Sequence, residues 1–130
     1  MSWWERQLNK LFAPANFTPV YTPYDLMTYT SVTTTKARAG RKSNNFAWVS
    51  VVVTGTIGGT LSSAIDITGF PDAALYSGQV LAARVQEGTV TAGGVAFFSN
   101  NTILRVKKRD GSNFTAGTVS IGVTGDYEIG

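Results

Sequence analysis

The carboxylates are the side chains of this sequence with the most direct route to catalysis. A glycoside hydrolase needs two carboxyl groups held about 5 to 10 Å apart across a groove. Asp126 and Glu128 lie two residues apart in a predicted strand and share one face, but this spacing serves surface solvation more often than catalysis. We therefore predict no catalytic pair among the eight carboxylates, which are Glu5, Asp25, Asp66, Asp72, Glu87, Asp110, Asp126 and Glu128.

Two residue types that dominate enzyme chemistry are missing from the 130 residues, because the sequence contains no His and no Cys. Neutral-pH proton transfer, thiolate chemistry and most zinc sites depend on these side chains. Gly55, Gly58 and Gly59 are followed by neither a Lys-Ser/Thr pair nor a helix signal, so they do not form a phosphate-binding loop. The sequence thus predicts a protein that is not an enzyme and that needs no cofactor and no metal.

The formal net charge of +3 comes mainly from two basic clusters, and the rest of the chain is close to neutral. Beyond Phe46 and Trp48, which a strand core would use, the clusters lack neighbouring aromatic residues on which bases could stack. We expect solvated loops or contacts with an acidic protein surface, and no nucleic-acid partner. The clusters are Lys36, Arg38, Arg41, Lys42 and Arg105, Lys107, Lys108, Arg109.

Membrane insertion and export are not indicated either. The sequence has no run of 18 apolar residues, and its N-terminus carries Glu5 and Arg6 where an export signal would have a basic region followed by an apolar stretch.

A short amphipathic helix is predicted at residues 2–13. Ser2 and Glu5 form a capping box, and Pro14 ends the run. A helix of about twelve residues is marginal alone in water, so its apolar stripe must be buried, either on its own β domain or against another chain. The stripe is the candidate oligomerisation or anchor site and consists of Trp3, Trp4, Leu8, Leu11 and Phe12.

Residues 14–25 are predicted to be an extended connector, because Pro14, Pro19 and Pro23 rule out a helix interior. The chain is therefore divided into a helix and arm at 1–25 and a β domain at 26–130. Phe17, Tyr21 and Tyr24 would lie along the surface of a neighbouring subunit.

From residue 26 onward, β-branched and aromatic runs alternate with Gly, Asn and Asp, which is typical of an all-β domain. We expect an antiparallel, jelly-roll-like β-sandwich of about seven to eight strands. The run from Ala47 to Val53 is apolar almost throughout and is predicted to be a central strand. Strands are predicted near 26–35, 45–55, 61–68, 79–87, 93–98, 102–108 and 117–129.

Three stretches carry a resemblance to a known family. They are the turn and apolar strand from Gly40 to Gly55, the strand that begins at Ala64 and leads into the turn Ile67-Thr68-Gly69-Phe70-Pro71, and the closing hairpin from Asn101 through Asp110-Gly111 to Ile129. In this order they resemble the C-terminal β domain of phage tail-fibre and related virion fibre or decoration proteins. The resemblance covers about residues 26 to 130 and implies a homotrimer whose loops contact a bacterial surface.

The resemblance yields a first hypothesis and two alternatives. The first is a phage virion protein, a short homotrimeric fibre or tail-tip knob that is made in the host cytoplasm, attaches to other virion proteins through residues 1–25 and mediates host adhesion. The second is a capsid decoration or cement protein that stabilises the head, and the third is a carbohydrate-binding module. We expect exposed aromatic and amide side chains near turns to suit a host glycan or protein, and the candidate contact residues are Tyr76, Asn100, Asn101, Asn113 and Phe114.

Overall fold

The computed structural model describes residues 2–4 and 14–130. Within them the chain forms one antiparallel sheet of nine strands. The strands are β1 (Ala15–Asn16), β2 (Val20–Pro23), β3 (Met27–Arg41), β4 (Phe46–Gly59), β5 (Ile65–Thr68), β6 (Val80–Glu87), β7 (Val90–Asn100), β8 (Ile103–Lys108) and β9 (Gly117–Glu128).

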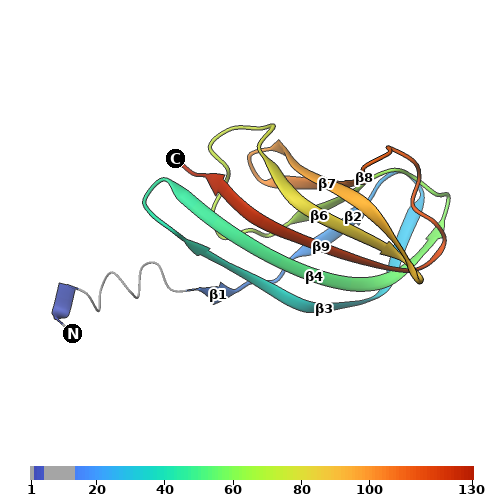
Figure 1. Ribbon diagram of the computed structural model, residues 1–130, viewed down its shortest axis with the longest axis horizontal. Helices are drawn as coiled ribbons and strands as arrows, with labels where there is room; N and C mark the ends of the chain where they lie inside the picture. The colour runs from blue at the N-terminus through green and yellow to red at the C-terminus, as the bar shows by residue number, and fades with distance from the viewer. Residues whose placement is uncertain (1, 5–13) are drawn as a thin grey trace.

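The strand order is β1-β3-β4-β9-β6-β7-β8-β5-β2. Strands β3 and β4 form a hairpin, as do β6 and β7, and β9 lies between these two hairpins although it is last in the sequence. Figure 1 shows that the sheet curls strongly, so that β2 passes behind the strands at the front. The curl brings β2 against β3, where the Tyr21 hydroxyl lies 2.9 Å from Thr34 Oγ1.

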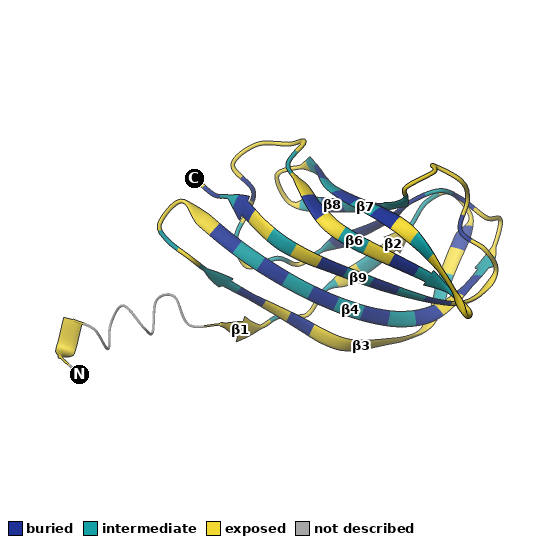
Figure 2. Ribbon diagram, viewed as in Figure 1, coloured by how far each residue is buried: buried dark blue, intermediate teal, exposed yellow. Residues whose placement is uncertain are grey.

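The core lies inside this curl and follows from the alternation of side chains along each strand. In β4, every second residue from Ala47 to Ile57 is buried, while Trp48, Ser50, Val52 and Thr54 on the other face are half-buried. Figure 2 shows the same alternation along β4 and β9. Each fully buried aliphatic or Phe side chain stabilises the fold by roughly 1.5 to 3 kcal/mol. The largest fully buried side chains include Phe98, Phe114, Ile57, Ile65, Ile67, Leu104 and Ile121.

Tyr29 ties three strands together across the core. A Cβ atom at Gly55 in β4 would lie 2.7 Å from Tyr29 Cε1, so the glycine leaves the room that the ring of Tyr29 occupies. The Tyr29 hydroxyl then donates a 2.8 Å hydrogen bond to the carbonyl of Val119 in β9. Burial raises the pKa of Tyr29, so the hydroxyl keeps the proton that this bond needs.

The antiparallel all-β prediction is confirmed, and all seven predicted strands are present as β3 to β9. The predicted sandwich of two facing sheets is not confirmed, because hydrogen bonds join all nine strands into one curled sheet. Long strands such as β3 and β4 can bend around the core and cover it from more than one side, which removes the need for a second sheet.

The predicted connector also differs from the structure. Residues 15–16 pair with β3 as β1, and residues 20–23 pair with β5 as β2. Pro23 is tolerated because it ends a strand at the edge of the sheet, where one side of the strand needs no ladder hydrogen bond. Phe17, between the two strands, packs against the core of its own chain and contacts Phe70 at a centroid distance of 5.4 Å. Residues 14–25 are therefore part of the β body.

The predicted N-terminal helix falls largely on residues 5–13, which lie outside the described residues together with Leu8, Leu11 and Phe12 of its stripe. Trp3 and Trp4 are described and are 61% and 71% exposed. Their rings contact each other edge to face, with centroids 5.2 Å apart. The anchor role of this stripe stays a prediction.

Candidate interaction surface

Three loops and the C-terminal residues meet at one end of the sheet. They are residues 42–45 between β3 and β4, 69–79 between β5 and β6, 101–102 between β7 and β8, and 129–130 after β9 (Figure 1). Backbone hydrogen bonds of 2.8 Å join them, from Ala74 N to Asn101 O, from Leu75 N to Glu128 O, and from Ile129 N to Asn45 O. The loops are therefore held to one another as well as to the strands that they connect.

Gln79 fixes the end of the long loop 69–79 to β9. Its side-chain amide donates from Nε2 to the carbonyl of Glu128 at 3.0 Å, and its Oε1 accepts from the backbone N–H of Glu128 at 2.7 Å. The side chain thereby acts as a short piece of backbone that pairs with β9. Because both partners are neutral amides, this attachment does not depend on pH.

Arg41, Asp72 and Tyr127 fix the beginning of the same loop. Arg41 Nη2 lies 2.7 Å from Asp72 Oδ1, and the Tyr127 hydroxyl donates a 2.8 Å hydrogen bond to the carbonyl of Asp72. Burial, with a smaller contribution from the Asp72 carboxylate, raises the pKa of Tyr127 to about 12. Tyr127 therefore remains a donor throughout the neutral range.

Apolar side chains project into solvent from this hydrogen-bonded end. They are Phe46, Leu75, Tyr76 and Val80, with exposed fractions of 42%, 49%, 49% and 65%, and we call this set the apolar end. Phe46 and Leu75 border a cavity of about 440 Å³ that is completed by Asn45, Glu128, Ile129 and Gly130. Large exposed apolar side chains that rim a hollow are a feature of binding surfaces, and loops already tied down lose little entropy on binding.

Three of the five predicted contact residues lie at this end. Tyr76 is half-exposed, and Asn101 Nδ2 donates to the carbonyl of Leu75 at 3.4 Å, which keeps it beside the 69–79 loop. Asn100 Oδ1 accepts the backbone N–H groups of Thr102 and Ile103 at 2.9 and 3.0 Å and shapes the turn. Asn100 and Asn101 are exposed.

The other two predicted contact residues lie at the opposite end, in the loop 109–116. Asn113 is exposed, but Phe114 is fully buried in the core, so the expectation of an exposed Phe114 ring is wrong. The ring is buried because the backbone N–H of Phe114 bonds to the carbonyl of Ser62, which draws the loop over the end of the curl. The structure therefore separates Asn113 and Phe114 from the three residues of the apolar end.

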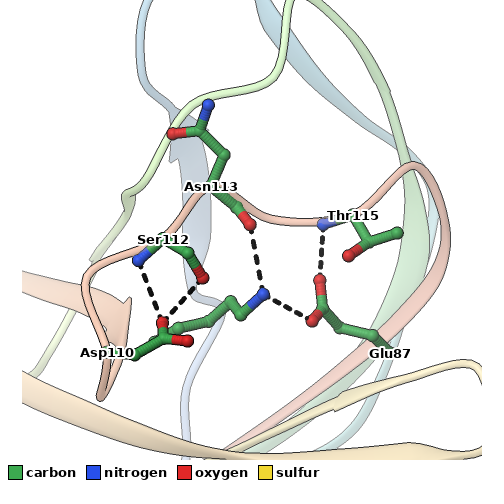
Figure 3. A network of polar contacts seen from close by, with 6 residues as sticks. Glu87, Asp110, Ser112, Asn113 and Thr115 are labelled. Atoms are coloured by element: carbon green, nitrogen blue, oxygen red, sulfur yellow. Dashed lines mark hydrogen bonds and ion pairs between the residues drawn. The ribbon is translucent and has the colours of Figure 1, made fainter.

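An ionic network fixes the loop 109–116 (Figure 3). Lys108 Nζ lies 2.7 Å from Glu87 Oε1 and donates to the carbonyl of Asn113 at 3.2 Å, while the backbone N–H of Thr115 donates to Glu87 Oε2. Burial alone would raise the pKa of Glu87, but the hydrogen bonds from Lys108 and Thr115 outweigh it and lower the pKa below its usual value. The side chains of Glu87 and Lys108 are only 10% and 11% exposed.

The other ion pairs of the described residues link strands and loops of the sheet. Asp66, Asp72 and Asp126 pair with Arg105, Arg41 and Lys42, respectively. Among residues 2–4 and 14–130, no cluster of three carboxylate, His or Cys side chains is suited to hold a metal ion. In the same residues, no helix has the length and apolar character needed to cross a bilayer.

Phe46, Leu75 and Val80 are the residues of this surface that sequence reasoning missed. Leu75 could have been predicted as a surface residue of a loop, since it is an apolar residue in a segment between two predicted strands. Phe46 and Val80 begin strands and gave no signal, because a strand residue can face either side.

Comparisons of the chain with protein-family models, with curated proteins and with solved structures return no match. They assign no family, so the resemblance to phage virion domains stays a prediction that rests on the sequence.

Proposed function

We propose that this chain is a non-enzymatic protein of a tailed-phage virion, a short homotrimeric fibre or tail-tip knob that mediates adhesion to the host surface. The observation that carries the adhesion part is the apolar end. Four exposed apolar side chains stand on a loop and on strand ends that hydrogen bonds hold in place, as expected of a preorganised contact surface. Tyr76, Asn100 and Asn101 supply an aromatic ring and amides for a glycan or protein partner.

The N-terminal segment supplies the assembly part of the proposal. Trp3 and Trp4 are largely exposed, and burying such rings against another chain would remove a large apolar area from water. Residues 1–13 are the proposed anchor and trimerisation segment, since residues 14–25 belong to the β body. A homotrimer of these curled β domains remains part of this proposal, which includes no nucleic acid, membrane, metal or cofactor.

The assembly part is tested by light scattering of the full chain at several concentrations. A mass three times 13.9 kDa is expected for the wild type, and a smaller mass for Trp3→Ser/Trp4→Ser. Val90→Ser is the matched control, because Val90 is 64% exposed at the other end of the sheet. A monomeric wild type at all concentrations would contradict the trimer.

The adhesion part is tested by measuring how the fluorescently labelled full chain binds to a panel of intact bacteria. Binding to a subset of strains is expected, with loss in Leu75→Ser/Tyr76→Ser and retention in Val90→Ser. Equal binding of both variants would remove the apolar end from the proposal. A decoration protein would bind none of the strains and would instead bind purified phage heads that lack it.

A further inference from the structure

Five cations share the outer face of the curled sheet and have no acidic partner among the described residues. The ion pairs of these residues use Arg41, Lys42, Arg105 and Lys108. Arg105 is further occupied by the ring of Tyr24, which lies 4.4 Å from its guanidinium carbon. The five remaining cations are Lys36, Arg38, Arg84, Lys107 and Arg109, and all but the half-buried Lys107 are exposed.

The pairing register places these cations in two rows that cross the sheet, because directly paired residues point to the same face. The Lys36 row runs Lys36, Val52, Gly122, Arg84, Gly93. The Arg38 row runs Arg38, Ser50, Thr124, Ala82, Val95, Lys107. Arg109 joins the first row, since its guanidinium carbon would lie 3.2 Å from a Cβ atom on Gly93.

The middle of both rows is a shallow trough. A depression of about 400 Å³ is lined by residues of β4, β6 and β9, among them Ser50, Ala82, Gly122 and Thr124. A Cβ atom on Gly122 would have no neighbour within 4 Å, so the floor of the trough is open. With neighbouring strands about 4.8 Å apart, Lys36 and Arg84 stand roughly 14 Å apart on opposite sides of it.

Neither row contains an Asp or Glu, so the cations of the two rows give the trough a positive electrostatic potential that no carboxylate of the rows reduces. Cations spaced on both sides of an uncharged strip suit a chain that carries negative charges at intervals. The Ser50 and Thr124 hydroxyls in the strip can donate to and accept from the hydroxyl groups of sugars.

We propose that this trough binds a linear acidic polysaccharide, a glycan chain with repeating carboxylate or phosphate groups. The proposal rests on the proposed adhesion function and names the class of host-surface ligand that it would use. Lys36 and Arg38 contact the anionic groups on one side of the glycan, and Arg84, Lys107 and Arg109 contact those on the other. The hydroxyls of the strip orient the sugar rings between them.

Two features of the surface favour a polysaccharide over a nucleic acid. Single-stranded nucleic acids are held by aromatic rings that stack on the bases, and neither row contains an aromatic residue. The core lies inside the curl, so the sheet bends away on both sides of the trough and a rigid duplex would touch it over a short length only. A flexible single glycan chain can follow such a surface.

The experiment measures binding of the full chain to size-matched alginate, poly(glycerol phosphate), neutral dextran and oligothymidylate by calorimetry at several salt concentrations. Binding to alginate, to poly(glycerol phosphate) or to both is expected. Which of the two polymers binds shows whether the trough recognises carboxylate or phosphate groups. We expect binding to weaken at least about tenfold between 50 and 300 mM NaCl, because salt screens exposed charges. Dextran should not bind measurably, and oligothymidylate should bind more weakly than the acidic glycan.

Two matched pairs of variants locate the site. Arg84→Gln should weaken binding about fivefold, whereas Lys42→Gln removes one charge outside the rows and should change it less than about twofold. Gly122→Glu places a carboxylate on the open floor and should weaken binding more than Gly122→Gln, which adds nearly the same volume without charge. Circular dichroism of each variant checks that the fold is retained.

Four results would overturn the proposal: no binding to either acidic glycan at low salt, equal binding to dextran, tighter binding to oligothymidylate, or equal effects within each matched pair. These results leave the oligomeric mass and the role of the apolar end untouched, so failure of the trough is distinguishable from failure of the proposed function.

Discussion

At one end of the sheet the loop 69–79 is fastened by the neutral amide of Gln79, by Tyr127 and by the partly exposed ion pair of Arg41 and Asp72. At the other end the loop 109–116 is fastened by the largely buried ion pair of Glu87 and Lys108. The first end leaves Leu75 and Tyr76 exposed, and the second draws Phe114 completely into the core. A loop can therefore be equally well held and either display or bury its apolar side chain. The two loops differ in where the backbone of the apolar residue is bound. The N–H of Phe114 bonds to Ser62 across the end of the curl, whereas the N–H of Leu75 bonds to Glu128 of β9.

The largest expected effect is at Phe114. Phe114→Ala should lower the free energy of unfolding by about 3 to 5 kcal/mol, because it leaves a cavity where a fully buried ring stood. Urea unfolding measures the change. The exposed neighbour Asn113 is the control, since Asn113→Ala keeps the backbone carbonyl that Lys108 uses and should change the free energy by less than about 0.5 kcal/mol. Similar losses of unfolding free energy in both variants would mean that the loop conformation, and not burial of the Phe114 ring, stabilises the fold.

A smaller effect is expected when the ionic network is broken. Glu87→Gln should lower the free energy of unfolding at pH 7 by about 2 kcal/mol, because it leaves the Lys108 ammonium, which is 11% exposed, without its counter-charge. The folded-state pKa of Glu87 is lowered, so its contribution is complete above its ordinary pKa of 4.5 and is lost as the pH falls below that value.

The same variant gives a pH test of the comparison. Urea unfolding of wild type and Glu87→Gln between pH 7 and pH 3 should converge as the pH falls. Asp110→Asn changes a fully exposed turn carboxylate beside the network and serves as the control. A constant difference between wild type and Glu87→Gln at all pH values would show that the charge of Glu87 does not stabilise the loop.

Tyr127→Phe should have a more modest effect. It removes the hydrogen bond to the Asp72 carbonyl but keeps the buried ring, so a loss of about 1 to 1.5 kcal/mol is expected. Because the pKa of Tyr127 is raised from 10.0 to about 12, its contribution is complete below pH 10 and is lost as the pH rises toward 12. The stability difference between wild type and variant should therefore narrow in alkali, which urea unfolding at pH 8 and pH 11 measures.

The smallest effect on stability is expected at the apolar end itself. Leu75→Ser changes a side chain that is half in solvent, so the free energy of unfolding should change by less than about 0.5 kcal/mol. Thermal unfolding of wild type and variant checks this. A loss of stability as large as that of Phe114→Ala would show that Leu75 supports the fold. The apolar end would then not be a surface that is free to contact a partner.

Much of the sheet could be predicted from the sequence, because alternation and turn residues are local signals. The apolar run from Ala47 to Val53 marks β4, and Asp110-Gly111 marks the turn after β8. Strands β1 and β2 were missed because Pro19 and Pro23 argue against a strand and because their partners, β3 and β5, are distant in the sequence. The single curled sheet was missed for a similar reason, since strand order is set by packing between distant segments.

The candidate surface was predicted less well than the fold. Tyr76, Asn100 and Asn101 were found because aromatic and amide residues at turns are visible in the sequence. Phe114 follows the same local rule and yet is buried, since its position depends on a hydrogen bond to Ser62, 52 residues earlier in the chain. The two cationic rows were out of reach, because they depend on the register of six strands.

The place of β9 in the sheet has a consequence for how the chain acquires its structure during synthesis. Strand β9 pairs with both β4 and β6, yet it is made after every other strand of the sheet. Until it emerges from the ribosome, the inward-facing valines of β4 and two strand edges have no cover. Pairing across so many intervening residues is slow, on a scale of about milliseconds to seconds. The sheet therefore completes its folding only after β9 has been made, and chains that still lack β9 are the species most prone to aggregate.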